Sequence, residues 1–187
     1  MSTKGSGNGQ GRPEQASGGA GAESHQVLTF VLGNETYGVD ILRVQEIRGW
    51  SAVTKIPHAP AHVLGVLNLR GSIVPIVDLR MRFALERAEY TAITVIIVVS
   101  VSSPAGRRDF GVVVDGVSDV VDVNSAEVKP APDLGSRSAT DFIRGLVPVS
   151  DRMVVLLDID RLISGEMAAV SGNDLDATDA AMTASAA

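Results

Sequence analysis

The stretch GNETYGVDI at residues 33–41 recurs without a gap as GRRDFGVVV at residues 106–114. A second ungapped match relates GVLNLRGSIVPIVDL at residues 65–79 to GLVPVSDRMVVLLDI at residues 145–159. The two blocks follow the same order in each half of the chain, which is the pattern of an internal repeat. The sequence therefore predicts a fold of two similar modules.

Short aliphatic runs, punctuated by Gly, Pro and Asn, fill the chain around these blocks. Aromatic residues make up only 4% of the chain, whereas Val, Ile and Leu are plentiful, and branched aliphatic side chains favour strands. We therefore expect a mainly β fold of small barrels with few helices. The expected strands cover residues 27–32, 37–40, 44–48, 66–69, 73–77, 91–101, 110–114, 117–123 and 153–157.

Single helical turns are expected after Pro60 and at residues 78–83 and 158–163. Asp78 and Asp158 begin the last two, at equivalent places of the repeat. A carboxylate at such a place accepts hydrogen bonds from free backbone N–H groups, and each module needs this cap. We therefore interpret both aspartates as helix caps rather than as catalytic groups.

The repeat also predicts the domain organisation. One domain is expected at residues 25–164, with a first barrel at about 26–88 and a second at about 91–163. Because each barrel alone would bury only a modest core, we expect a shared apolar interface, strand exchange at the crossing, and a binding groove between the barrels. Residues 1–24 and 165–187 are dominated by small and polar residues, so a disordered N-terminal tail and a flexible C-terminal tail are expected.

The composition narrows the possible partners. A net charge of −6 and a pI near 5.0 argue against binding to nucleic acid or to anionic membranes, since both require clustered Lys and Arg. The longest apolar run, residues 92–101, is about half as long as a membrane-spanning helix, so no direct membrane insertion is expected. The chain has no cysteine, which fits a cytoplasmic protein.

No set of catalytic or metal-binding residues stands out. His58 and His62 lie four residues apart, but a proline separates them and no third ligand is evident. Asp115, Asp119 and Asp122 lack the Gly and Glu positions of a calcium loop. The serines lack the sequence context of a hydrolase nucleophile. We therefore expect no enzyme activity, no metal site and no cofactor.

The repeat differs between its copies at one place. NLRG at residues 68–71 becomes PVSD at residues 148–151, so only the first copy carries Arg70. Glu46 lies in an otherwise apolar strand and is a candidate partner for Arg70. A charge among apolar neighbours is either paired or presented to a partner. An internal ion pair and a binding role both remain open, and the two can coexist.

Four segments carry a resemblance to a known family. They are ETYGVDILRVQEIRG at 35–49, GVLNLRGSIVPIVDLR at 65–80, FGVVVDGVSDV at 110–120 and DRMVVLLDI at 151–159. In this order they resemble the bacterial chemotaxis coupling proteins of the CheW family, over about residues 27–163. The resemblance implies two intertwined five-stranded SH3-like barrels with a few short helices.

The resemblance also implies a function. It implies a non-enzymatic adaptor that joins the cytoplasmic tip of methyl-accepting chemotaxis receptors to the regulatory domain of the histidine kinase CheA, and that is recruited to membrane receptor arrays. One alternative is a CheW-like scaffold of another chemosensory array, serving surface motility or gene regulation. A small-molecule-binding or hydrolytic barrel is a further alternative.

The receptor-facing region of the family falls on a small set of matched positions, whereas no kinase-facing residues are assigned. Ile47 and Val120 are equivalent in the repeat and could line two sides of one groove, which with a charged rim would suit a helical hairpin tip. Leu64 stands where the family often has Lys, so a basic contact is lost there. The implied receptor-binding residues are Val44, Glu46, Ile47, Arg70, Gly71, Gly111 and Val120.

Overall fold

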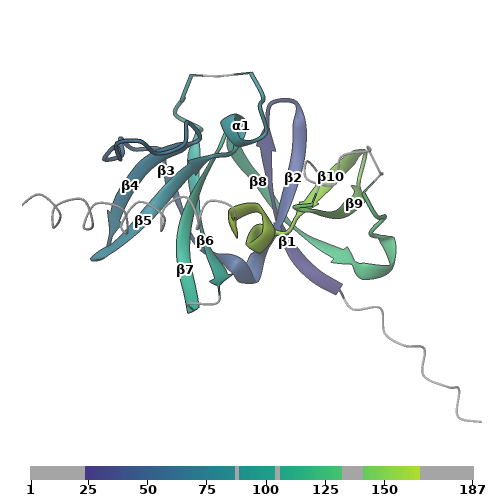
Figure 1. Cartoon of the computed structure of the whole chain (residues 1–187). Helices are drawn as coiled ribbons and strands as arrows, with labels where there is room; N and C mark the ends of the chain where they lie inside the picture. The colour runs from purple at the N-terminus through teal and green to yellow at the C-terminus, as the bar shows by residue number, and fades with distance from the viewer. Residues whose placement is uncertain (1–23, 87–88, 104–105, 132–140, 165–187) are drawn as a thin grey trace, which may run out of the picture.

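The computed structural model describes residues 24–86, 89–103, 106–131 and 141–164. This part of the chain contains ten strands in two five-stranded sheets (Figure 1). Short helical segments are α1 (Leu79–Arg82), two 3-10 turns at Ile41–Arg43 and Ser125–Glu127, and residues 159–164. The strands are β1 (Ser24–Leu32), β2 (Glu35–Asp40), β3 (Val44–Gly49), β4 (Val63–Leu69), β5 (Ser72–Asp78), β6 (Val95–Ser103), β7 (Gly106–Val114), β8 (Gly116–Asn124), β9 (Ile143–Val149) and β10 (Arg152–Leu157).

The two halves of the repeat exchange strands. One sheet has the order β3-β6-β7-β5-β4 and uses five consecutive strands; we call it the contiguous barrel. The other has the order β8-β1-β2-β10-β9 and takes strands from both ends of the described chain; we call it the split barrel. Each half of the repeat therefore places its first hairpin, β1–β2 or β6–β7, in the barrel of the other half.

This exchange corrects the expected limits of the two barrels. Barrels at about 26–88 and about 91–163 would each keep their own hairpin, whereas β1 and β2 pair with β8 and β10, and β6 and β7 pair with β3 and β5. The predicted mainly β class, with intertwined five-stranded barrels and few helices, is confirmed. The expected tails lie outside the described residues, Ser24 excepted.

The exchange buries both faces of each hairpin. Successive side chains of a strand point to opposite faces of the sheet. In β6, Ile96 packs in the interior of the contiguous barrel, whereas Ile97 packs in a large cluster shared by both barrels. In β1, Val27 packs inside the split barrel and Leu28 in the shared cluster. The expected apolar interface between the barrels is therefore the main core of the protein.

A short segment closes each barrel after its first edge strand. In the contiguous barrel, Thr54 follows β3 and exchanges backbone hydrogen bonds of 3.0 and 2.8 Å with Val66 of β4. In the split barrel, Lys129 follows β8 and exchanges two hydrogen bonds of 2.8 Å with Leu146 of β9. The repeat thus uses the same device twice to turn an open sheet into a barrel.

The closing segments pass directly over two glycines that are equivalent in the repeat. A Cβ atom on Gly65 would lie 2.1 Å from the carbonyl oxygen of Thr54, and one on Gly145 would lie 2.6 Å from the carbonyl oxygen of Lys129. Only glycine lets the two backbones approach this closely. Gly65 also has a φ of +146°, which other residues rarely adopt.

Several details of the strand prediction are wrong; β4 and β7, for example, begin at Val63 and Gly106 rather than at residues 66 and 110. The expected strand at 91–101 begins only at Val95, because residues 91–94 form a hydrogen-bonded turn. Strand β9 was not expected; Pro148 is compatible with it because β9 lies at the edge of its sheet.

The helical turns at Asp78 and Asp158 are short and capped as predicted. Oδ1 of Asp78 accepts hydrogen bonds from the N–H groups of Arg80 and Met81 at 2.8 and 3.2 Å. Oδ1 of Asp158 accepts one from the N–H group of Arg161 at 3.1 Å. The helical turn expected after Pro60 is wrong, because residues 61–62 form a simple turn and β4 begins at Val63. No helix in the described ranges has the length and apolar character needed to cross a membrane.

Replacing Gly65 with Ala is expected to lower the free energy of unfolding by more than about 2 kcal/mol, because the new methyl group would collide with the backbone of the closing strand. Urea denaturation measures this change. Gly49→Ala is the matched control, since a Cβ atom there meets no atom within 4 Å, and we expect a change of about 0.5 kcal/mol or less. Equal losses in the two variants would contradict the closure argument.

Candidate functional site

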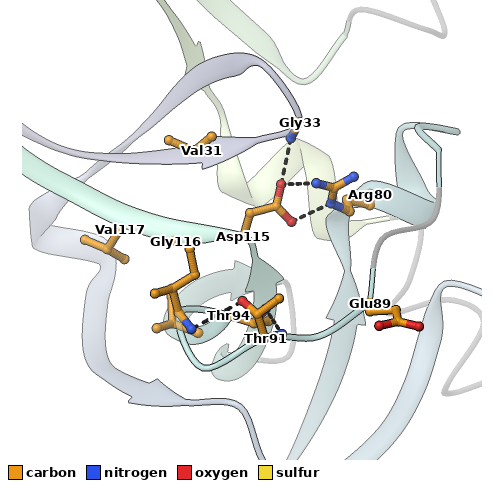
Figure 2. A pocket seen from close by; sticks show the side chains of 11 residues that line it. Val31, Gly33, Arg80, Glu89, Thr91, Thr94, Asp115, Gly116 and Val117 are labelled. Atoms are coloured by element: carbon orange, nitrogen blue, oxygen red, sulfur yellow. Dashed lines mark hydrogen bonds and ion pairs between the residues drawn. The ribbon is translucent and has the colours of Figure 1, made fainter.

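A cavity of about 690 Å³ lies where the two barrels meet, and we call it the inter-barrel groove (Figure 2). The split barrel contributes β1, the β1–β2 turn and the start of β8, and the contiguous barrel contributes α1 and the start of β6. The groove therefore depends on the exchange of strands. Its lining residues are Val31, Gly33, Arg80, Glu89, Thr91, Ile93, Thr94, Val95, Asp115, Gly116 and Val117.

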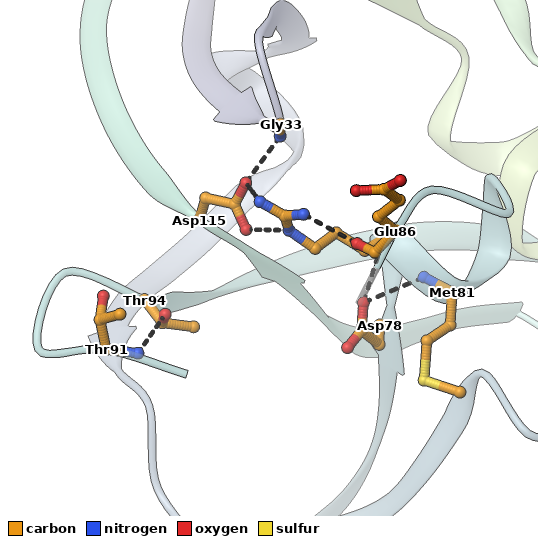
Figure 3. Close-up of polar contacts among 8 residues, drawn as sticks. Gly33, Asp78, Met81, Glu86, Thr91, Thr94 and Asp115 are labelled. Atoms are coloured by element: carbon orange, nitrogen blue, oxygen red, sulfur yellow. Dashed lines mark hydrogen bonds and ion pairs between the residues drawn. The ribbon is translucent and has the colours of Figure 1, made fainter. Parts of the chain in front are cut away.

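An ion pair between Arg80 and Asp115 lies in the groove (Figure 2), and Figure 3 shows the carboxylate of Asp115 facing Gly33. Nε and Nη2 of Arg80 donate to the two carboxylate oxygens of Asp115, and the N–H group of Gly33 donates to Oδ2 at 2.7 Å. The hydrogen bonds with Asp115, together with the charges of Asp115 and Asp78, raise the pKa of Arg80, although burial acts in the opposite direction. The pair thus links α1 of the contiguous barrel to the hairpin turn of the split barrel.

One wall of the groove is the turn at residues 91–94, whose two threonines are joined by a hydrogen bond in Figure 2. The N–H group of Thr91 donates to Oγ1 of Thr94 at 2.9 Å, and the N–H group of Thr94 donates to the carbonyl oxygen of Thr91 at 3.1 Å. Side-chain to backbone hydrogen bonds of this kind stabilise turns. The wall is therefore an ordered structure.

Strand register places three of the predicted receptor-binding residues on the faces that enclose the groove. Directly opposed residues of neighbouring strands share a face. Val44 and Ile47 of β3 lie opposite Val99 and Ile97, which belong to the cluster between the barrels. On β8, Val120 lies opposite Leu28, which belongs to the same cluster.

The groove lining continues along the same two faces. Val95 of β6 lies two residues before Ile97, and Val117 of β8 lies opposite Phe30. Residues two apart in a strand share a face, so the side chains of Val95 and Ile47 lie on one face of the contiguous sheet. Side chains from both barrels thus extend the apolar surface of the groove along β3 and β8.

Glu46 and Arg70 do not lie on the faces that enclose the groove. Glu46 is opposite Val98, whose side chain packs inside the contiguous barrel, so it points away from the face that carries Ile47. Nη2 of Arg70 lies 3.3 Å from Oε2 of Glu46, and the two side chains are 88% and 32% exposed. An exposed pair of this kind contributes at most about 1 kcal/mol, so the pair exists and Arg70 is still available to a partner.

The two predicted glycines have different environments. Gly71 follows Arg70 in the exposed β4–β5 turn, and the two residues have φ values of +91° and +54°, as in a tight hairpin turn. Gly111 is buried in β7, where a Cβ atom would lie 2.5 Å from Cδ1 of Ile76 and 2.8 Å from Cγ2 of Ile96. Packing inside the barrel requires this glycine. Gly111 therefore presents no exposed surface, and its role in receptor binding stays a prediction.

The two most exposed aliphatic side chains of the described residues were absent from the predicted site. Leu42, in the 3-10 turn after β2, is 83% exposed, and Ile93 is 72% exposed. No signal in the sequence marked Ile93 as exposed, because Thr91 and Thr94 are β-branched and fit a strand as well as a turn. Nothing in the sequence around Leu42 indicated its exposure. Within the described ranges, no cluster of three or more His, Asp or Glu side chains is arranged to hold a metal ion.

Replacing Asp115 with Ala is expected to lower the free energy of unfolding by about 2–3 kcal/mol, because Arg80 then loses two charged hydrogen bonds and Gly33 loses its acceptor. Urea denaturation measures the loss. The control is Arg161→Ala, which breaks an ion pair with Asp158 in which Arg161 is 68% exposed, and we expect a change below about 1 kcal/mol. Similar losses in both variants would show that the groove pair contributes no more than an exposed one.

Comparisons with known proteins identify the family. The chain is 47% identical over 148 residues to the chemotaxis protein CheW of Klebsiella aerogenes, an alignment that covers 79% of this chain and 87% of that protein. It is 41% identical over 141 residues to the chemotaxis protein CheW of Rhizobium meliloti, with 75% and 88% covered. The crystal structure of the scaffolding protein TtCheW from Thermoanaerobacter tengcongensis is similar with a TM-score of 0.68 and 29% identity, covering 75% of this chain and 93% of that one.

A family model described as the CheW-like domain matches residues 26–167, which include both barrels. The match covers most of the chain, and so do the alignments with both relatives. The chain therefore belongs to the family of proteins with a CheW-like domain.

Proposed function

We propose that this chain is a non-enzymatic adaptor that couples methyl-accepting chemotaxis receptors to the histidine kinase CheA. The names of its relatives support the proposal, because two are chemotaxis proteins and the solved relative is a scaffolding protein. The unit that acts is the domain at residues 25–164. The observation that carries the proposal is the apolar groove between its two barrels.

The groove suits the tip of a helical hairpin from a receptor. Val95 and Val117 line it, and Ile47 and Val120 extend its apolar faces with side chains that are each 44% exposed. Helices bind such grooves by inserting aliphatic side chains at intervals of three and four residues. Covering these side chains would remove apolar surface from water, which favours association.

Arg70 supplies a second, charged contact in this proposal. Its side chain is 88% exposed at the β4–β5 turn, where Gly71 leaves room for a partner to approach the backbone. Glu46 orients the guanidinium group without enclosing it. An acidic side chain of the receptor can therefore pair with Arg70 while the apolar tip occupies the groove.

The adaptor role requires a second surface for the kinase. We place the regulatory domain of CheA on a barrel surface that the receptor leaves free, so that both partners bind at once. Binding to receptors would recruit the protein to membrane receptor arrays. Changes in receptor state would then reach the kinase through the adaptor.

The first test is a pull-down with a receptor cytoplasmic fragment and CheA from the same organism. Replacing Arg70 with Ala is expected to weaken receptor binding about tenfold and to change stability by less than about 1 kcal/mol, because its ion pair is exposed. Ser150→Ala is the matched control, since Ser150 occupies the equivalent turn with a φ of +53° and carries no charge. We expect this control to bind like the wild type.

The outcomes separate the alternatives. A ternary complex that forms with the wild type and is lost with the folded Arg70→Ala variant would support the proposal. Failure of the wild type to bind either partner at micromolar concentrations would contradict it and would direct the search to another chemosensory array.

A further inference from the structure

Ile93 is an aliphatic side chain in an unusual position. It lines the inter-barrel groove and yet is 72% exposed. The shared core does not account for it, because Ile93 is absent from the clusters of buried and partly buried residues that hold the described barrels together. Its turn also lies in the connection between the two halves of the repeat, at residues 84–94, so the symmetry of the barrels does not require it.

The backbone around Ile93 is held in place from both sides. The N–H group of Ile93 donates to Oγ1 of Thr91 at 3.3 Å. The carbonyl oxygen of Thr94 accepts a hydrogen bond of 3.0 Å from the N–H group of Trp50, which follows β3. A rigid backbone that keeps an apolar side chain in solvent is preorganised for binding, because little conformational entropy is lost on association.

An aromatic contact fixes the chain that leads into this turn. The rings of Trp50 and Tyr90 have centroids 4.1 Å apart. The hydroxyl group of Tyr90 donates to Oδ2 of Asp78 at 2.8 Å, and the same carboxylate caps α1. Glu89, directly before Tyr90, therefore lies in a segment that is tied to both the sheet and the helix.

The charges of the groove favour a cationic partner. Arg80 and Asp115 neutralise each other through their bidentate ion pair. Glu89 is the other charged residue of the described lining, so one positive and two negative side chains leave a net charge of −1. The side chain of Glu89 is exposed, and a Lys or Arg of a bound partner can reach it.

We infer that Ile93 and Glu89 together select the receptor that occupies the groove. The preferred partner is a helical tip that places an aliphatic side chain against Ile93 and a Lys or Arg one turn away against Glu89. This inference rests on the proposed function, and it assigns the chemistry of the partner to two residues outside the predicted receptor-binding set.

The inference is tested by measuring the affinity of the full-length chain for a receptor cytoplasmic fragment in a calorimetric titration. Replacing Ile93 with Ser is expected to weaken receptor binding about tenfold and to leave CheA binding unchanged. Met153→Ser is the matched control, because Met153 is an aliphatic side chain that is 46% exposed on β10 and does not line the groove. We expect this control to bind both partners like the wild type.

The charge is tested separately with Glu89→Lys. Receptor binding by the wild type should weaken as salt is added, whereas the Glu89→Lys variant should bind more weakly at low salt and should depend less steeply on salt, because only the contact with Arg70 is then left. Thermal unfolding of each variant shows whether it is folded, and because both side chains are exposed we expect little change.

Each outcome gives a decision. If the wild type binds the receptor and the folded Ile93→Ser variant binds equally well, the inference is wrong and the proposed function stands. If Met153→Ser weakens receptor binding as much as Ile93→Ser, the effect is not specific to the groove and the inference is also wrong. If the wild type binds CheA but no receptor fragment, the proposed function fails and the inference fails with it.

Discussion

The structure depends on the burial of both faces of two hairpins. A hairpin at the surface of a single barrel would cover that barrel with one apolar face and expose the other to water. The hairpins β1–β2 and β6–β7 avoid this exposure because each completes the barrel of the other half and faces the shared cluster with its second side. The two barrels are thereby joined through their largest core, and the groove at their crossing is a direct consequence.

Two ion pairs of opposite polarity hold this crossing. Arg80 follows β5, the last strand of the first half of the repeat, and pairs with Asp115, where the chain crosses from β7 to β8. Asp160, the equivalent residue of the second half, pairs at 2.5 Å with Arg43, where the chain crosses from β2 to β3. If the two helical turns were interchanged, like charges would meet at both places. Both halves of the repeat therefore use an ion pair at this place, but with the positions of the acidic and basic residues exchanged. This charge pattern favours the observed pairing of each helical turn with its own crossing.

The same strand geometry divides the predicted site into two parts. Adjacent residues of a strand point to opposite faces, so Ile47 lies on the face that borders the groove whereas Glu46 lies on the other. A partner that contacts both parts must therefore reach around the edge strand β3. The exposed guanidinium group of Arg70, tethered by Glu46, is well placed for such a contact.

The sequence by itself determined the repeat, the mainly β class, the positions of most strands and the caps at Asp78 and Asp158, because these features follow from local patterns of residues. Only the tertiary structure decided which hairpin completes which barrel, that Gly111 is buried, and that Ile93 is held exposed beside the groove. A strand with two apolar faces has the same sequence pattern whichever barrel it joins. The partners of such a strand are set by the packing of segments far apart in the chain, so the local periodicity of the sequence does not predict them.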